Sequence, residues 1–186
     1  MEFQHVPVLL QEVLDGLAIR PDGIYVDGTV GGAGHSREIA KRLTAGGQLI
    51  GFDRDPDAVA AATERLAGYP ATVVHHNYDE MQTVLTEMGL APVDGVLLDL
   101  GVSSHQLDEE SRGFSYHADA PLDMRMSQTG MTAEELVNTI SEEELARILF
   151  TYGEESFARS IARRIVQARQ EKADSHDTGA GRTDQK

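Results

Sequence analysis

Three aspartates and one glycine-rich loop are the residues of this sequence whose types and spacing could support chemistry. Four glycines fall within the seven positions from Gly28 to Gly34, directly after Asp27. Asp53 and Asp99 each end a later apolar run. Glycines let a backbone approach a ligand closely, and carboxylates accept hydrogen bonds from hydroxyl and ammonium groups. We therefore expect a ligand-binding site around this loop.

The spacing of the glycines separates two classes of ligand. The dinucleotide fingerprint G-x-G-x-x-G, read from Gly32 and Gly34, would need a third glycine where Arg37 stands, which disfavours a nicotinamide-dependent dehydrogenase. Asp27 would repel a pyrophosphate but suits a sulfonium or ammonium group. Asp53 can accept both hydroxyls of an adenosine ribose. Together they favour S-adenosyl-L-methionine as the cofactor; the alternative is that both aspartates only end strands and begin turns.

Two residues further along the chain extend this site. Tyr78 can stack on or line an adenine ring, or serve as a half-buried core aromatic. Asp99 heads the segment DLGVSS, and amino-group methyltransferases place a short polar motif headed by Asp or Asn here. Its oxygen would accept a hydrogen from the target amine and hold that amine in line with the methyl group; the alternative is one more strand-end carboxylate. The scattered histidines have no convincing metal-ligand spacing, so no metal is expected.

Four short apolar runs must position these residues. They are separated by helical patterns and lie at 23–27, 47–53, 71–76 and 93–101. Such runs, about 20–25 residues apart with helices between them, are typical of βαβ units. They predict an α/β fold with a parallel sheet that is buried on both faces.

The sequence after the fourth run changes character and predicts a helical appendage. Two helix starts carry capping boxes, Thr132 with Glu135 and Ser141 with Glu144. A third helix is expected over 154–172, with an apolar face formed by Phe157, Ile161, Ile165 and Ala168. The last residues have no large apolar side chain and predict a disordered tail. The expected division is a cofactor-binding domain at 1–105, a helical insert at 106–172 and the tail at 173–186.

Composition narrows the protein class. The chain of 186 residues has a net charge of −15 and no cysteine, which excludes disulfides and thiolate metal sites. No apolar run approaches the roughly 20 residues that span a bilayer, and no signal peptide is recognisable, so a cytoplasmic protein without membrane contact is expected. The acidic charge opposes nucleic-acid binding, and the densest basic stretch, within 159–172, is either an RNA-contacting surface or a solvated helix face.

Six short sequence motifs, called blocks below, resemble those of a known protein family. In chain order they are HVPVLLQEVL, DGTVGGAGHS, DRDP, LLDLGVSSHQLD, RGFSY and PLDMRM. With them the chain, from about residue 5 to 172, resembles the bacterial 16S ribosomal RNA (cytosine-N(4))-methyltransferases. The resemblance implies a Rossmann-like class I methyltransferase sheet with an inserted helical domain, and methyl transfer from S-adenosyl-L-methionine to the exocyclic amine of a cytidine in the decoding centre. The 16S rRNA of the small ribosomal subunit would be the partner, while the oligomeric state stays open. The cofactor-binding residues that the resemblance implies are Ala33, Gly34, His35, Asp53, Tyr78, Asp99 and Gln106, with Asp99 also catalytic.

The chain also departs from that family. Members are longer and return to the sheet after the insert, with a segment resembling SFHSLEDR that this sequence lacks. The pattern is expected to end at about Ala173, which indicates a C-terminally truncated protein with an incomplete sheet. Two functions therefore remain open: an active rRNA methyltransferase, or a non-catalytic remnant that at most binds S-adenosyl-L-methionine.

Overall fold

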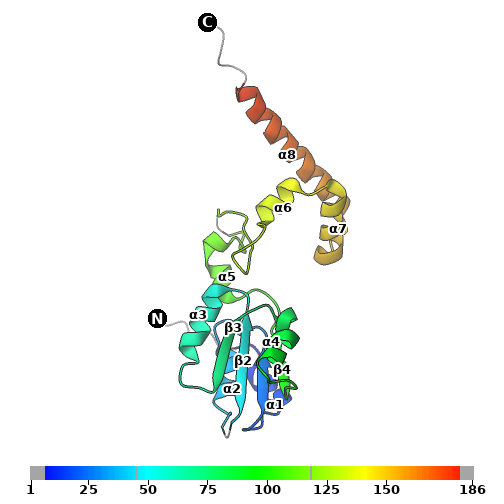
Figure 1. The fold of residues 1–186 in the computed structure, drawn as a ribbon. Helices are drawn as coiled ribbons and strands as arrows, with labels where there is room; N and C mark the ends of the chain where they lie inside the picture. The colour runs from blue at the N-terminus through cyan, green and yellow to red at the C-terminus, as the bar shows by residue number, and fades with distance from the viewer. Residues whose placement is uncertain (1–6, 45, 118, 181–186) are drawn as a thin grey trace. The chain divides into compact units, whose positions relative to one another are not determined.

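A four-stranded parallel sheet forms the centre of the first part of the chain (Figure 1). The computed structural model describes residues 7–44, 46–117 and 119–180, with side chains as far as residue 171. The strands are β1 (Ile24–Asp27), β2 (Gln48–Asp53), β3 (Ala71–His75) and β4 (Gly95–Leu97), in the order β3-β2-β1-β4. All neighbouring pairs are parallel, which confirms the predicted α/β sheet. The order reverses between β1 and β4, and ligands of open α/β sheets bind at such a switch point.

Helices precede, connect and follow these strands. They are α1 (Leu10–Leu17), α2 (Gly34–Ala40), α3 (Pro56–Arg65), the short 3₁₀ helix η1 (Tyr78–Glu80), α4 (Met81–Glu87) and α5 (Ser104–Asp108). Successive strand residues point to opposite faces, and both faces of the two central strands, β1 and β2, are covered. Tyr25 and Leu49 belong to a core with residues of α1, α2 and α3, whereas Val26 and Ile50 pack with Leu85 of α4. A sheet buried on both faces needs apolar residues at consecutive positions, which explains the unbroken apolar runs.

The chain forms two compact units. The first is Met1–Asp108 with Met126–Thr129, and the second is Glu109–Arg125 with Gly130–Lys186. The first unit ends with α5 at Asp108, three residues beyond the expected boundary at 105. The segment Met126–Thr129, placed by the sequence inside the insert, belongs with the sheet.

The second unit contains η2 (Glu110–Arg112), α6 (Ala133–Thr139), α7 (Glu142–Gly153) and α8 (Ala158–Ala180). Arg112 of the RGFSY block is buried, and its guanidinium donates to the backbone carbonyl of Arg125 in the PLDMRM block at 3.0 Å. A Cβ on Gly113, whose φ is +71°, would come within 2.3 Å of the carbonyl oxygen of Pro121. The two blocks thus fold against each other, and this close approach requires a glycine.

Two details of the expected helices differ from the structure. The capping box at Thr132 is complete, but at Ser141 only the hydroxyl takes part, because the Glu144 side chain pairs with Arg147. Phe157, expected on the apolar face of the last helix, precedes α8 and is 72% exposed.

The buried face of α8 is formed by small residues. Ala158 and Ala162 are buried, and Arg169 lies further along, where its guanidinium donates to the carbonyls of Val137 and Ile140 at 2.8 and 2.7 Å. Arg169 therefore satisfies carbonyls at the end of α6 and is not free for RNA.

Helix α8 also continues past residue 172, where the insert was expected to end. It is helical to Ala180, within the segment expected to be a disordered tail, and residues 181–186 lie outside the described residues. Each residue added to an existing helix gains one backbone hydrogen bond, so a polar segment can extend a helix that packing has already started. No described helix combines the length and the apolar character that crossing a membrane requires.

Gly51 of β2 lies against Val30 of the glycine loop, so a substitution here tests how closely the two are packed. A Cβ at this position would lie 2.9 Å from Cγ2 of the buried Val30. We expect Gly51→Ala to lower the free energy of unfolding by about 1–3 kcal/mol through overpacking, measured by urea denaturation. Gly16→Ala in α1 is the matched control, because nothing lies within 4 Å of its added Cβ. Equal stability of Gly51→Ala and the wild type would contradict the close packing.

Candidate functional site

The Asp27 carboxylate holds the glycine loop to the end of β1. Asp27 is 1% exposed; its Oδ2 accepts from the Ser36 hydroxyl at 2.7 Å, and its Oδ1 accepts from the Thr29 backbone N–H at 3.0 Å. Burial raises the pKa of the Asp27 carboxyl above its ordinary value, while these hydrogen bonds and the nearby His35 act in the opposite direction. The sequence suggested Asp27 as a partner for a cationic ligand. The structure places this carboxylate inside the fold, where it positions the loop.

The loop itself is fastened to the end of β2. The Val30 N–H donates to the Phe52 carbonyl at 3.0 Å, and the Gly31 N–H donates to Asp53 Oδ2 at 2.9 Å. Asp53 Oδ1 accepts from the Asp55 N–H at 2.9 Å. Each carboxylate oxygen has two lone pairs, so Asp53 keeps acceptor capacity on both oxygens. Asp53 is half-buried, and its position at the loop fits a ligand with two neighbouring hydroxyls.

Asp99 reaches the same loop from the end of β4. Its backbone N–H donates to the Thr29 hydroxyl at 2.7 Å, and its side chain is 56% exposed. Its Oδ2 lies 4.0 Å from Nδ1 of His35, beyond hydrogen-bond distance. The structure thus brings together two residues, His35 and Asp99, that are 64 positions apart in the sequence.

Tyr78 borders the first glycine of the loop. A Cβ on Gly28 would lie 2.5 Å from Cδ2 of Leu98, 3.1 Å from Cβ of Tyr78 and 3.2 Å from Cε of Met81. Gly28 is therefore enclosed by residues that follow β3 and β4. Tyr78 is 42% exposed, which leaves part of its surface open to a ligand beside the loop.

Ala33, Gly34 and His35 form the start of α2. Ala33 adopts a left-handed conformation with φ of 61°, and the first helical residue is Gly34. Pro7 covers Gly34, since an added Cβ would come within 2.6 Å of Pro7 Cγ, and the His35 ring Nε2 lies 2.8 Å from the Val8 carbonyl oxygen. The block HVPVLLQEVL thereby supports the loop through its described residues Pro7 and Val8.

Gln106 belongs to a buried polar network around Asp55. Its Nε2 donates to Asp55 Oδ2 at 2.9 Å, and its Oε1 accepts from the Ser103 N–H at 3.0 Å. Gln128 donates to Asp55 Oδ1 at 3.1 Å and to Asp57 Oδ2 at 2.8 Å. Gln106 therefore links the segment after Asp99 to the start of α3 and is only 5% exposed.

The structure adds residues that were not expected from the sequence. Thr29 and Ser36 connect Asp27 to the rest of the loop. Asp55 could have been found, because an aspartate before a proline is typical of a helix start, and its side chain accepts from the Asp57 N–H. Gln128 carried no local signal, since its partners lie more than 70 residues away.

The chemistry of these groups favours a cationic ligand with hydroxyls. Asp53 and Asp99 present carboxylates at the carboxyl ends of β2 and β4, which opposes a phosphate. Among the described residues, no group of three or more His, Asp or Glu side chains could hold a metal ion. A sulfonium-bearing nucleoside such as S-adenosylmethionine fits this set of hydrogen-bond acceptors.

The described part of the chain has a Rossmann-like α/β fold with four strands of a parallel sheet. Comparison with known families shows where this chain belongs: the model of the MraW methylase family matches residues 2–178. The chain belongs to this family. The match runs past Ala173, where the family pattern was expected to end.

Curated relatives agree with the family. Ribosomal RNA small subunit methyltransferase H of Lachnospira eligens is 62% identical over 175 residues, covering 92% of this chain and 56% of that protein. A protein named Ribosomal RNA small subunit methyltransferase H 2, from Agathobacter rectalis, is 58% identical over 174 residues, covering 91% and 55%. The chain thus spans little more than half the length of these relatives.

The buried carboxylate of Asp27 makes stability depend on pH. Because its pKa is raised in the folded state, its contribution to stability is full below the ordinary pKa and is lost as the pH rises through the raised value. The side-chain amide of an Asp27→Asn variant does not titrate. We expect the stability of the wild type relative to Asp27→Asn to fall as the pH increases from about 3 to about 8, measured by urea denaturation. Asp22→Asn, which removes an exposed carboxylate, is the matched control. A stability difference between wild type and Asp27→Asn that is constant or rises with pH would contradict this role.

Proposed function

We propose that this chain is the cofactor-binding part of an S-adenosyl-L-methionine-dependent methyltransferase that modifies the exocyclic N(4) amine of a cytidine in 16S rRNA of the small ribosomal subunit. The observation that carries the proposal is the convergence of Asp53, Asp99 and His35 around one glycine loop at the switch point of the sheet. The family and the names of the curated relatives support the rRNA substrate.

In this proposal the loop and the strand ends each bind a different part of the cofactor. Asp53 accepts the ribose hydroxyls with the lone pairs that Gly31 and Asp55 leave free. Tyr78 lines the adenine. Ala33, Gly34 and His35 surround the methionine end. Gln106 places the segment after Asp99 by its bonds to Ser103 and Asp55.

Asp99 is the proposed catalytic residue. When bound, the cofactor supplies a methyl group on a positively charged sulfur. The Asp99 carboxylate accepts a hydrogen from the cytidine amine and so directs the nitrogen lone pair toward that methyl group. The proton that the amine loses once the new carbon–nitrogen bond has formed leaves to water. The Thr29 hydroxyl fixes Asp99 through its backbone N–H at 2.7 Å, which keeps the carboxylate beside the loop.

A second candidate function, cofactor binding without methyl transfer, is favoured by the charge of the chain. The residues proposed to hold the cofactor lie within the described part of the chain, whereas catalysis also needs an RNA-binding surface. The net charge of −15 opposes the approach of phosphates.

Two measurements on the full chain separate these functions. Titration calorimetry measures the binding of S-adenosylmethionine, and transfer of a labelled methyl group to undermethylated small ribosomal subunits measures catalysis. Binding with transfer supports the enzyme, and binding alone supports the non-catalytic function. No binding would contradict both, and binding of NADH would favour the dehydrogenase that the glycine spacing disfavours.

Asp53→Ala tests the ribose contact. We expect a loss of about 1–3 kcal/mol in the binding free energy of S-adenosylmethionine, measured by calorimetry. Because Asp53 also holds the Gly31 N–H, the 2′-deoxyribose analogue of the cofactor provides the control. The analogue should bind more weakly than the cofactor to the wild type and equally to Asp53→Ala. An undiminished preference in the variant would place the ribose elsewhere.

Asp99→Ala tests the catalytic role in the methyl-transfer assay. We expect the transfer rate to fall by about 10²-fold, with a smaller effect on cofactor binding because Asp53 and the loop are unchanged. Asp99→Asn keeps a carbonyl oxygen as acceptor and should retain most of the rate. Equal losses in both variants would show that the negative charge, and not the acceptor, is required.

A further inference from the structure

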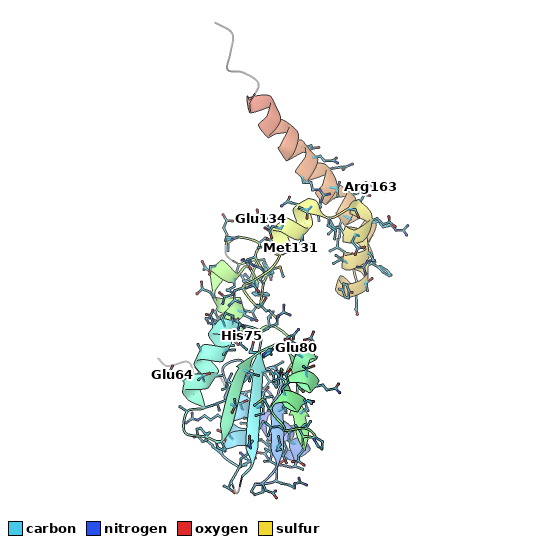
Figure 2. All side chains as sticks on the ribbon, viewed as in Figure 1. Glu64, His75, Glu80, Met131, Glu134 and Arg163 are labelled. Atoms are coloured by element: carbon cyan, nitrogen blue, oxygen red, sulfur yellow. The ribbon has the colours of Figure 1, made fainter. Side chains whose placement is uncertain are left out.

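Asp55 is a buried carboxylate that the proposed chemistry does not use. It follows Asp53 by two residues and is 1% exposed. Asp53 ends β2 beside its strand partner His75 of β3, which Figure 2 labels at this end of the sheet. A carboxylate inside a protein is costly unless hydrogen bonds compensate for the lost water. The hydrogen-bond partners of Asp55 therefore indicate what this carboxylate does.

Donors from three parts of the chain converge on Asp55. The Asp57 N–H donates to Oδ1 at 3.2 Å and so caps α3. The side-chain amide of Gln128 donates to Oδ1 at 3.1 Å, and that of Gln106 donates to Oδ2 at 2.9 Å. A helix cap needs only the first of these bonds, as the single hydroxyl of Ser141 shows at α7. The two amides therefore fix the carboxylate more firmly than capping requires.

The backbone N–H of Asp55 carries this constraint to Asp53. It donates to Asp53 Oδ1 at 2.9 Å, while the Gly31 N–H donates to Asp53 Oδ2 at 2.9 Å. A carboxylate held at one oxygen can rotate about that bond, whereas a carboxylate held at both oxygens has a fixed plane. The lone pairs that remain on Asp53 then point in fixed directions, and hydroxyl donors bind well only along those directions.

Gln128 holds Asp55 from a distant segment of the chain. Its Nε2 also donates to Asp57 Oδ2 at 2.8 Å, so both amide hydrogens are used between two carboxylates. Its backbone is left-handed with φ of 58°, which is unfavourable for a residue with a side chain. Such a conformation persists where surrounding contacts hold it, and these two hydrogen bonds are contacts of that kind. They tie the segment Met126–Thr129, which belongs to the first unit, to the start of α3.

We propose that Asp55 is a positioning residue: held by Gln128, it orients the Asp53 carboxylate toward the ribose hydroxyls of the cofactor. This inference rests on the proposed function, which places the ribose at Asp53. Gln128 acts on ribose binding through Asp55, without contacting the cofactor itself. The segment Met126–Thr129 contributes in this way to the selection of ribose over deoxyribose, although 73 positions separate Gln128 from Asp55.

The test measures the preference for ribose by titration calorimetry on the full chain. S-adenosylhomocysteine is compared with its 2′-deoxyribose analogue, and the ratio of the two dissociation constants is the readout. For the wild type we expect about a tenfold preference for the ribose ligand. Gln128→Met keeps the length of the side chain but removes both donors, and the preference should fall to about threefold. A purely structural loss would weaken the binding of both ligands alike and leave the ratio unchanged.

Asp55→Ser shows whether Gln128 acts through Asp55. Serine still caps α3 but lacks the carboxylate that receives the amides of Gln106 and Gln128, so the preference should again fall to about threefold. Effects of residues in one hydrogen-bond network are not additive, and the double variant should therefore show the preference of Asp55→Ser alone. Gln82→Met removes an exposed amide on α4 and is the matched control, which should bind both ligands as the wild type does.

The outcomes separate this inference from the proposed function. An unchanged preference in Gln128→Met, or a further fall in the double variant, would overturn the positioning role and leave the cofactor site standing. If thermal unfolding shows that Asp55→Ser does not fold, Gln128→Met decides by itself, because Gln128 is exposed. Equal binding of both ligands to the wild type would remove the ribose contact of Asp53 and this inference with it. If neither ligand bound the wild type, the proposed cofactor site itself would fail.

Discussion

The buried carboxylate of Asp27 is the interaction on which the rest of the site depends. It receives the Ser36 hydroxyl from α2 and the Thr29 N–H from the loop, and the Thr29 hydroxyl in turn receives the N–H of Asp99. The end of β1, the start of α2 and the segment after β4 are thus joined through two side chains. A carboxylate taken out of water is costly unless it is hydrogen-bonded, so this arrangement stabilises the fold only when all its partners are in place.

The order of the strands brings two carboxylates beside the loop that Asp27 holds. Because β2 and β4 both neighbour β1, Asp53 and Asp99 emerge on either side of the loop that Asp27 holds. The hydrogen bonds of the loop end at strand carbonyls and carboxylates, which leaves the exposed part of Asp99 and the second lone pairs of Asp53 for a ligand. Hydrogen bonds therefore hold the loop in place, while acceptor oxygens of Asp53 and Asp99 beside it remain available to a ligand.

Much of the architecture was predictable because it depends on local patterns. The four apolar runs became four parallel strands, and the capping box at Thr132 is present as expected. Contacts between residues far apart in the sequence were harder to predict. Phe157 and Ala168, expected on the apolar face of the last helix, are exposed, whereas Ala158 and Ala162 are buried. The Glu144 side chain pairs with Arg147 and does not complete the capping box at Ser141. Helical spacing alone does not say which of two adjacent faces a partner helix will cover.

The sequence by itself determined the parallel α/β sheet, the family blocks and the candidate residues Asp53, Tyr78 and Asp99, because strand periodicity and motif spacing are local properties. Only the tertiary structure decided what each carboxylate does. Asp27 and Asp53 both end strands, yet one is 1% exposed and the other half-buried. Burial and hydrogen-bond partners arise from elements far apart in the chain, so no local pattern can separate a carboxylate that holds the loop from one that can hold a ligand.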